Sequence, residues 1–251
     1  MTVSVPLERA EEARAVMLDQ FPRGFEEREG DGVLELAAYT ERADAVRLLG
    51  ELGPVRELEV VAGWEDEWRR FHRPVRVGPL WISPSWEAAD ADADATAIVI
   101  DPGRAFGTGA HATTRLCLEL LLGLEPSSLV DLGAGSGVLA VAAAKLGFAP
   151  VVALENDDAA VEAARRNAAA NDVEVEVRSA DVLADPLPAV EVAVANIARE
   201  PVERAAERFA GSFVVGSGYL EDEQPAAKGW RVTDRRLSEG WAADLLVRAS
   251  S

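Results

Sequence analysis

Hydrophobic residues from residue 96 onward gather in short continuous runs, and alanine-rich segments with helical periodicity separate these runs. The runs are rich in β-branched side chains and occupy residues 97–100, 129–132, 151–154, 173–177, 190–195, 213–216 and 241–247. Continuous apolar strands that alternate with helices are typical of a parallel sheet with helices on both faces. The pattern therefore predicts a doubly wound α/β domain over residues 96–251.

The first 61 residues follow a different pattern of shorter elements. Strand-like segments lie at residues 2–5, 24–28, 32–38 and 55–61, and helix-like segments lie at residues 7–20 and 41–52. The resulting order β-α-β-β-α-β is that of a ferredoxin-like module. We therefore expect a small ferredoxin-like α+β domain over residues 1–61.

Aromatic residues concentrate between these two regions. Trp64, Trp68 and Phe71 share one face of a predicted short helix, because they follow the spacing i, i+4, i+7. Trp81 and Trp86 follow among β-branched residues. We expect a linker helix and loop over residues 62–95.

A low-complexity stretch near the end of this linker alternates aspartate with alanine, at Asp90, Asp92 and Asp94. A calcium loop of this kind needs glycine at its sixth position and glutamate at its twelfth, where the chain has Ala95 and Asp101. The stretch therefore predicts a solvated loop and no metal site.

The charge balance is strongly acidic, with 44 acidic against 25 basic residues and a formal net charge of −19. Nucleic-acid binding needs a basic face that neutralises phosphates, and the sequence offers no clear one, so we expect none. The field of an acidic chain attracts a basic partner, yet the same charge can serve only solubility, and both interpretations stay open.

The compartment is indicated by what the sequence lacks. No stretch approaches the ~18 apolar residues of a membrane span, and the start of the chain has no apolar core of signal-peptide length. With Cys117 as the single cysteine, the chain cannot form an internal disulfide. The position of Cys117 on a predicted helix beside leucines indicates a small core residue. We expect a cytoplasmic protein.

A glycine-rich turn follows the predicted strand at 129–132. Gly133, Gly135 and Gly137 permit positive φ angles and let a ligand approach the backbone. The G-x-G-x-G spacing differs from the dinucleotide fingerprint G-x-G-x-x-G. Asp131 enters the turn, and its carboxylate repels a pyrophosphate but suits an ammonium group, such as that of S-adenosylmethionine.

Two further carboxylates follow the next two strands. Glu155 ends the second strand, 155 − 133 = 22 residues after Gly133, where a carboxylate can accept hydrogen bonds from ribose hydroxyls. Asp181 follows the third strand, the usual place for a side chain that reads the adenine amino group. An equally good interpretation of Asp181 is a cap or an exposed loop acid.

The sequence VDLGAGSG at 130–137, followed by Glu155, resembles the motifs of class I methyltransferases. Residues 101–121 (DPGRAFGTGAHATTRLCLELL) and 194–201 (VANIAREP) are similar to the PrmA family, which methylates the eleventh protein of the large ribosomal subunit. Residues 65–86 are similar to the aromatic linker of that family. The resemblance implies a Rossmann-like domain that uses S-adenosyl-L-methionine to methylate lysine side chains or the N-terminal amine of a basic ribosomal protein.

The resemblance also implies site residues. The positions expected to contact the cofactor are Thr114, Gly133, Glu155 and Asn196. Gly135 of the glycine-rich turn and Asp181 after the third strand join them as expected contacts. Phe106, Gly107 and Thr108 are expected to close over the cofactor. The family has a bulkier apolar residue where this chain has Ala198, followed here by Arg199, which leaves the shape of the amine pocket open.

Methyl transfer to nitrogen requires a neutral amine aligned with the methyl group. The Asn196 side-chain oxygen can accept the amine N–H and direct the lone pair, without a charge that would keep the amine protonated. We therefore assign Asn196 as the catalytic residue.

Two nearby residues keep two interpretations each. His111 is either a general base or a residue that shapes its loop, and the structural role is favoured. Thr113 is either an N-cap or a ligand contact.

Other functions remain for the same sheet. A class I methyltransferase acting on another protein or on a small amine would use the same catalytic residues. A nicotinamide-dependent oxidoreductase is disfavoured by the glycine spacing and by Asp131.

Overall fold

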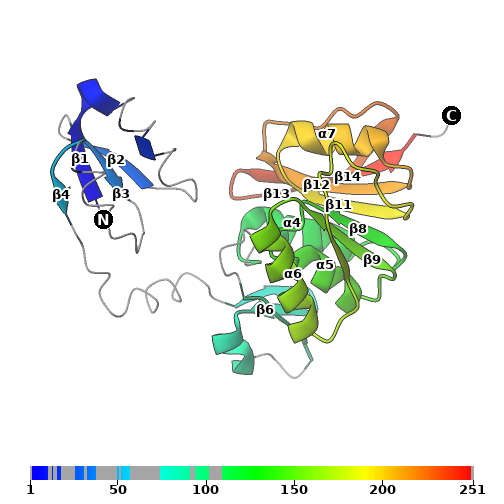
Figure 1. The fold of residues 1–251 in the computed structure, drawn as a ribbon. Coiled ribbons are helices and arrows are strands. Elements are labelled where there is room, and N and C mark those ends of the chain that lie inside the picture. Colours follow the sequence, from blue (N-terminus) through cyan, green and yellow to red (C-terminus); the bar gives the residue numbers. More distant parts are fainter. Residues whose placement is uncertain are drawn as a thin grey trace. The chain divides into compact units, whose positions relative to one another are not determined.

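The computed structural model describes residues 2–10, 13, 16–17, 26–30, 33–37, 50, 52–56, 74–90, 94–101 and 109–249. The chain divides into two compact units, Met1–Glu67 and Trp68–Ser251 (Figure 1). Among the described residues, no helix combines the length and the apolar character needed to cross a membrane.

The first unit contains a four-stranded sheet in the order β2-β3-β1-β4, with every neighbouring pair antiparallel. Its described elements are β1 (Thr2–Pro6), the 3-10 helix η1 (Leu7–Arg9), β2 (Glu26–Gly30), β3 (Val33–Ala37) and β4 (Val55–Arg56). The first three predicted strands are confirmed with ends shifted by up to two residues. The predicted helix at 41–52 falls almost wholly outside the described residues.

A small core holds this unit together. Val3 and Val5 alternate with exposed or half-buried neighbours along β1, as expected for a strand with one buried face. Ala10, Ala13 and Met17 are buried in the same core, and their i, i+3, i+7 spacing places them on one face of the helix predicted at 7–20.

The second unit is built on a seven-stranded sheet in the order β10-β9-β8-β11-β12-β14-β13. Its strands are β8 (Leu129–Leu132), β9 (Val151–Glu155), β10 (Glu176–Ser179), β11 (Val192–Asn196), β12 (Phe213–Leu220), β13 (Trp230–Ser238) and β14 (Trp241–Arg248). The helices are α4 (Ala112–Leu121), α5 (Val138–Lys145), α6 (Asp158–Ala170) and α7 (Arg199–Arg208). The Rossmann-like α/β prediction is therefore confirmed for this unit.

The prediction of a parallel sheet is wrong at one edge. β14 pairs antiparallel with β12 and with β13, so the sheet is mixed. Sequence reasoning missed β13, since its residues WRVTDRRLS are mostly polar and half-buried or exposed, as on an edge strand.

The apolar run at 97–100 also lies elsewhere than predicted. It forms β7 (Thr96–Val99), which belongs to a separate three-stranded sheet with β5 (Val75–Val77) and β6 (Leu80–Ser83). The 3-10 segment η2 (Ser85–Asp90) lies between β6 and β7 in the chain. Ile98 and Ile100 are buried in the same core as Leu80 and Ile82, which explains why the run is as apolar as a central strand. Residues 75–83, which the sequence places in the linker, thus pack within the second unit.

The large sheet has a separate core on each face. Val151 and Ala153 belong to the cluster that includes residues of α4 and α5, while Val152 and Leu154 belong to the cluster that includes residues of α7. This alternation explains the continuous apolar run of β9. The order of the strands reverses at β8, whose neighbours are β9 and β11, so a ligand crevice is expected at the carboxyl ends of these three strands.

Candidate active site

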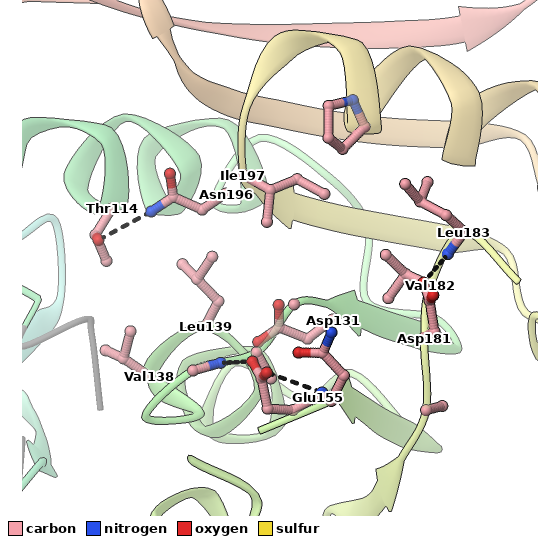
Figure 2. A pocket seen from close by; sticks show the side chains of 16 residues that line it. Thr114, Asp131, Val138, Leu139, Glu155, Asp181, Val182, Leu183, Asn196 and Ile197 are labelled. Atoms are coloured by element: carbon pink, nitrogen blue, oxygen red, sulfur yellow. Dashed lines mark hydrogen bonds between the residues drawn. The ribbon is translucent and has the colours of Figure 1, made fainter. Parts of the chain in front are cut away.

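A cavity of about 380 Å³ lies at the carboxyl ends of β8, β9 and β11, within the size range of small-molecule sites. Figure 2 shows the side chains that line it. Its polar lining residues are Thr114, Asp131, Glu155, Asn156, Asp181 and Asn196. Its other lining residues are Gly133, Ala134, Gly135, Val138, Leu139, Ala180, Val182, Leu183, Ile197 and Pro201. The structure thus brings together six residues that the sequence analysis expects to contact the cofactor, although they come from separate parts of the chain. They are Thr114, Gly133, Gly135, Glu155, Asp181 and Asn196.

The glycine loop forms one wall of the cavity. Gly133 adopts φ +76°, and a Cβ there would lie 2.7 Å from Ile197 Cγ2. Gly137 adopts φ +79° as the N-cap of α5, and a Cβ there would lie 3.0 Å from the Ala164 Cβ. The predicted positive φ angles are confirmed at both glycines. The neighbouring Ile197 and Ala164 side chains also leave little room for a Cβ there.

Glu155 ties the second strand to this loop. Its Oε2 accepts a hydrogen bond from the Gly135 amide at 2.8 Å, and its Oε1 accepts from the amides of Asn156 and Asp157 at 2.8 and 3.0 Å. A carboxylate oxygen has more than one acceptor site, so Glu155 can keep these bonds and still face a ligand.

Asp131 is the most unusual polar group of the cavity. Its side chain is buried, its Oδ2 accepts from the Ala140 amide at 3.0 Å, and its Oδ1 has no hydrogen-bond partner among the residues that the structure describes. Burial raises the pKa of Asp131 to about 7; the hydrogen bond from Ala140 opposes this rise, and the nearby charge of Glu155 adds to it. A buried, unpaired carboxylate oxygen on a cavity wall is suited to a cationic ligand.

Asn196 ends β11 on the opposite side of the cavity. Its Nδ2 donates to Thr114 Oγ1 at 3.2 Å, and Thr114 is fully buried in α4. This hydrogen bond fixes the amide so that Oδ1 remains the atom with free acceptor capacity (Figure 2). Thr114 therefore lines the cavity and also orients Asn196.

The remaining predicted residues have mixed outcomes. Asp181 lines the cavity, but its Oδ1 accepts from the Leu183 amide at 2.8 Å, as a loop-capping acid does. Phe106, Gly107 and Thr108 lie outside the described residues. Sequence reasoning assigned no role to Ile197 and Pro201, although both lie in the VANIAREP stretch at 194–201 that contains Asn196.

His111 is found in a structural role. It is the N-cap of α4: its Nδ1 lies 2.7 Å from Thr113 Oγ1 and accepts from the Thr113 amide at 3.4 Å. Its ring packs edge-on against Trp241, with centroids 5.1 Å apart. Neither His111 nor Thr113 lines the cavity, so the favoured interpretation of His111 as a loop-shaping residue agrees with these contacts.

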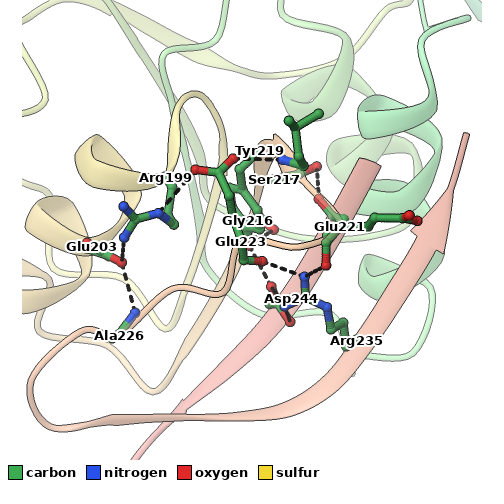
Figure 3. Close-up of polar contacts among 12 residues, drawn as sticks. Arg199, Glu203, Gly216, Ser217, Tyr219, Glu221, Glu223, Ala226, Arg235 and Asp244 are labelled. Atoms are coloured by element: carbon green, nitrogen blue, oxygen red, sulfur yellow. Dashed lines mark hydrogen bonds and ion pairs between the residues drawn. The ribbon is translucent and has the colours of Figure 1, made fainter. Parts of the chain in front are cut away.

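Two arginines, Arg199 and Arg235, hold the segment that follows β12 (Figure 3). Since β12 runs parallel to β11, this segment begins at the same edge of the sheet as the carboxyl end of β11. Arg199 pairs with Glu203 at 2.6 Å and with Glu223 at 3.4 Å. Its guanidinium charge is thus balanced by two carboxylates, and the pKa of Arg199 is raised, mainly by the hydrogen bond to Glu203. Arg199, which follows Ala198, therefore ties α7 to this segment through its ion pair with Glu223.

Arg235 reaches the same segment from β13. It donates to the carbonyls of Glu221 and Glu223 at 2.9 and 2.5 Å, and it lies 3.2 Å from Asp244 Oδ2. Asp244 is fully buried and also contacts the Tyr219 hydroxyl at 2.9 Å. Burial raises the pKa of Asp244, whereas Tyr219 and Arg235 act against that rise.

Replacement of Arg235 should therefore destabilise the second unit. We expect Arg235→Ala to lower the free energy of unfolding by about 2–4 kcal/mol, because it leaves a buried carboxylate without its cation. The matched control is Arg236→Ala, since Arg236 pairs only at the surface with Asp234 at 2.9 Å and should cost less than about 1 kcal/mol. Urea unfolding measures both; equal losses would contradict the role given to Arg235.

Comparison with known proteins gives consistent results. The model of one protein family, described as ribosomal protein L11 methyltransferase (PrmA), matches residues 33–243. The ribosomal protein L11 methyltransferase of Caldicellulosiruptor saccharolyticus is 40% identical over 166 residues, which are 63% of this chain and 55% of that protein. The protein of the same name from Symbiobacterium thermophilum is 38% identical over 215 residues, 80% of this chain and 71% of that protein.

A solved structure is also similar. The ribosomal protein L11 methylase from Lactobacillus delbrueckii subsp. bulgaricus is 28% identical, with a TM-score of 0.64 over 71% of this chain and 100% of that one. The matched region spans 55% and 61% of the length of the C. saccharolyticus protein and of a Legionella pneumophila relative, respectively.

Proposed function

This chain belongs to the PrmA family of ribosomal protein L11 methyltransferases, and from that membership and the cavity's geometry we propose that it methylates amino groups of ribosomal protein L11. The methyl donor in this proposal is S-adenosyl-L-methionine. The observation that carries it is the unpaired Oδ1 of buried Asp131, which shares one cavity with Asn196.

The residues present fit this cofactor. Gly133 and Gly135 line the cavity, so at these two positions no side chain stands between the backbone and a ligand. Asp131 suits an ammonium group and opposes a pyrophosphate, which disfavours a dinucleotide. Glu155 and Asp181 line the same cavity and would hold the ribose hydroxyls and the adenine amino group.

The chain's own residues explain how an amine would be methylated. When bound, S-adenosyl-L-methionine supplies a methyl group that is already activated for displacement. Asn196 Oδ1 accepts the N–H of the incoming amine and so directs its lone pair, while Thr114 holds the Asn196 amide in that orientation. A lysine amine has an ordinary pKa near ~10.4, and the neutral Asn196 side chain does not add to the stability of its protonated form.

We assign substrate recognition to the first unit. Its antiparallel order β2-β3-β1-β4 supports a ferredoxin-like module, with the aromatic linker after residue 61 and the catalytic domain beyond it. The net charge of −19 favours a basic protein substrate over nucleic acid. A cytoplasmic location stays a prediction.

The proposal is tested in two steps with the full chain. S-adenosylhomocysteine should raise the melting temperature and NAD should not, because only a ligand of the native state stabilises it. Purified ribosomal protein L11 incubated with methyl-labelled cofactor should then gain label on lysines or its N-terminus. A melting temperature raised by NAD alone would exclude the cofactor, and an unlabelled L11 alongside cofactor binding would exclude the substrate.

A further inference from the structure

Two asparagines, Asn167 in α6 and Asn171 at its C-cap, are buried, although asparagine is usually exposed. Asn167 is 2% exposed and Asn171 is 4% exposed. Both side chains form hydrogen bonds with main-chain groups of the segment that contains β7 and the residues directly after it.

Each asparagine acts as a neighbouring strand would, Asn171 toward the last residue of β7 and Asn167 toward Asp101, two residues beyond it. Asn171 Oδ1 accepts from the Val99 amide at 2.8 Å, and its Nδ2 donates to the Val99 carbonyl at 2.6 Å. Asn167 Oδ1 accepts from the Asp101 amide at 3.1 Å, and its Nδ2 donates to the Asp101 carbonyl at 3.2 Å. Four residues of helix rise about 6.0 Å and two residues of extended chain about 6.6 Å, so the two spacings match.

The two side chains differ in one further bond. Asn171 Nδ2 donates back to the Asn167 carbonyl at 2.7 Å. Asn167 Nδ2 instead donates to the Ser136 carbonyl at 2.8 Å. Ser136 is fully buried between Gly135 and Gly137, so Asn167 alone of the pair reaches the glycine loop.

This bond acts directly beside the part of the loop that lines the cavity. Gly135 lines the cavity, and its amide donates to Glu155. Asn167 donates to the carbonyl of the following residue, Ser136, and it holds Asp101 at the same time. Loss of the amide group at position 167 would leave buried main-chain groups short of partners, which costs more than an exposed bond.

We propose that Asn167 is a positioning residue for the cofactor: it fixes the Ser136 carbonyl relative to Asp101 and so keeps the glycine loop in its binding conformation. This inference rests on the proposed function, because it names the cofactor as the ligand of that loop. Asn171 anchors the same strand but does not position the loop.

A matched pair of variants of the full chain tests this. Asn167→Asp and Asn171→Asp each keep the acceptor for a strand amide and lose donors to two carbonyls, so they perturb stability alike. Calorimetric titration with S-adenosylhomocysteine, on samples shown to be folded by circular dichroism, should give about tenfold weaker binding for Asn167→Asp and less than about twofold for Asn171→Asp. The KM for the cofactor should rise in proportion, while kcat at saturating cofactor stays within about twofold.

The pair Asn167→Ala and Asn171→Ala repeats the comparison without a new charge, and it replaces the first pair if Asn167→Asp does not fold. Equal weakening in both members, or none in the Asn167 variant, would overturn the positioning role. Failure of the unaltered chain to bind S-adenosylhomocysteine would instead overturn the proposed function, so the two failures are distinguishable.

Discussion

An Asn196→Ala variant is expected to lose at least about a hundredfold in kcat while it still binds S-adenosylhomocysteine. The reason is alignment: misplacement of a reacting group by about 1 Å costs about a hundredfold, and Asn196 Oδ1 is the acceptor that the Thr114 hydrogen bond leaves available. Single-turnover methylation of L11 measures the rate, and calorimetry measures binding.

Three further variants separate orientation of the Asn196 amide from the mere presence of a polar group. Asn196→Asp keeps an acceptor oxygen but adds a charge that stabilises the protonated amine, so its rate should be low at neutral pH and recover as the pH rises. Thr114→Val removes the group that orients the amide and should lower kcat about tenfold, whereas Thr114→Ser should retain most activity. Full turnover in Asn196→Ala would refute the assignment.

The parts of the fold that the sequence predicts are those with a local cause. The strands at 129–132 and 151–154 are apolar because both faces of the sheet are covered. The glycine loop can be predicted from the sequence because its φ angles of +76° and +79° at Gly133 and Gly137 are costly for residues other than glycine. The location of Glu155 follows from the length of one β-α-β repeat.

The parts that the sequence does not predict depend on distant partners. β7 has the composition of a central strand, but it pairs with β6 in another sheet, and Asn171 at the C-cap of α6 bonds to its last residue, Val99. Asn167 and Asn171 follow a helical pattern that is equally typical of an exposed face. Their burial is visible only once the strand packs beside them.

Asp131→Asn is expected to move stability and cofactor affinity in opposite directions. The rise in the pKa of Asp131 from 3.8 to about 7 means that the folded protein binds this proton more tightly than the unfolded chain. Keeping the carboxylate ionised above pH ~7 therefore costs up to about 4 kcal/mol. Asparagine has the same shape and an oxygen for the Ala140 amide, but it adds an N–H that needs a partner, so we expect a net gain of about 1–3 kcal/mol.

The pH dependence follows with a definite sign. Because the folded pKa lies above the unfolded one, the cost is absent below pH ~4, grows between pH ~4 and ~7, and is constant above. The advantage of Asp131→Asn in urea unfolding should follow that curve. Asp181→Asn is the control: Asp181 is an exposed carboxylate of the same cavity, and its replacement should change the unfolding free energy by less than about 0.5 kcal/mol at neutral pH.

Cofactor binding should show the opposite dependence. A cationic ligand prefers ionised Asp131, so affinity for S-adenosylhomocysteine in the unaltered protein should fall by up to about tenfold per unit as the pH drops below ~7. Asp131→Asn should bind at least about tenfold more weakly at pH ~7 and lose this acid limb, because no carboxylate remains to titrate. A variant that keeps both the affinity and the acid limb of the original would show that the unpaired Oδ1 of Asp131 is not the group that receives the cofactor's ammonium.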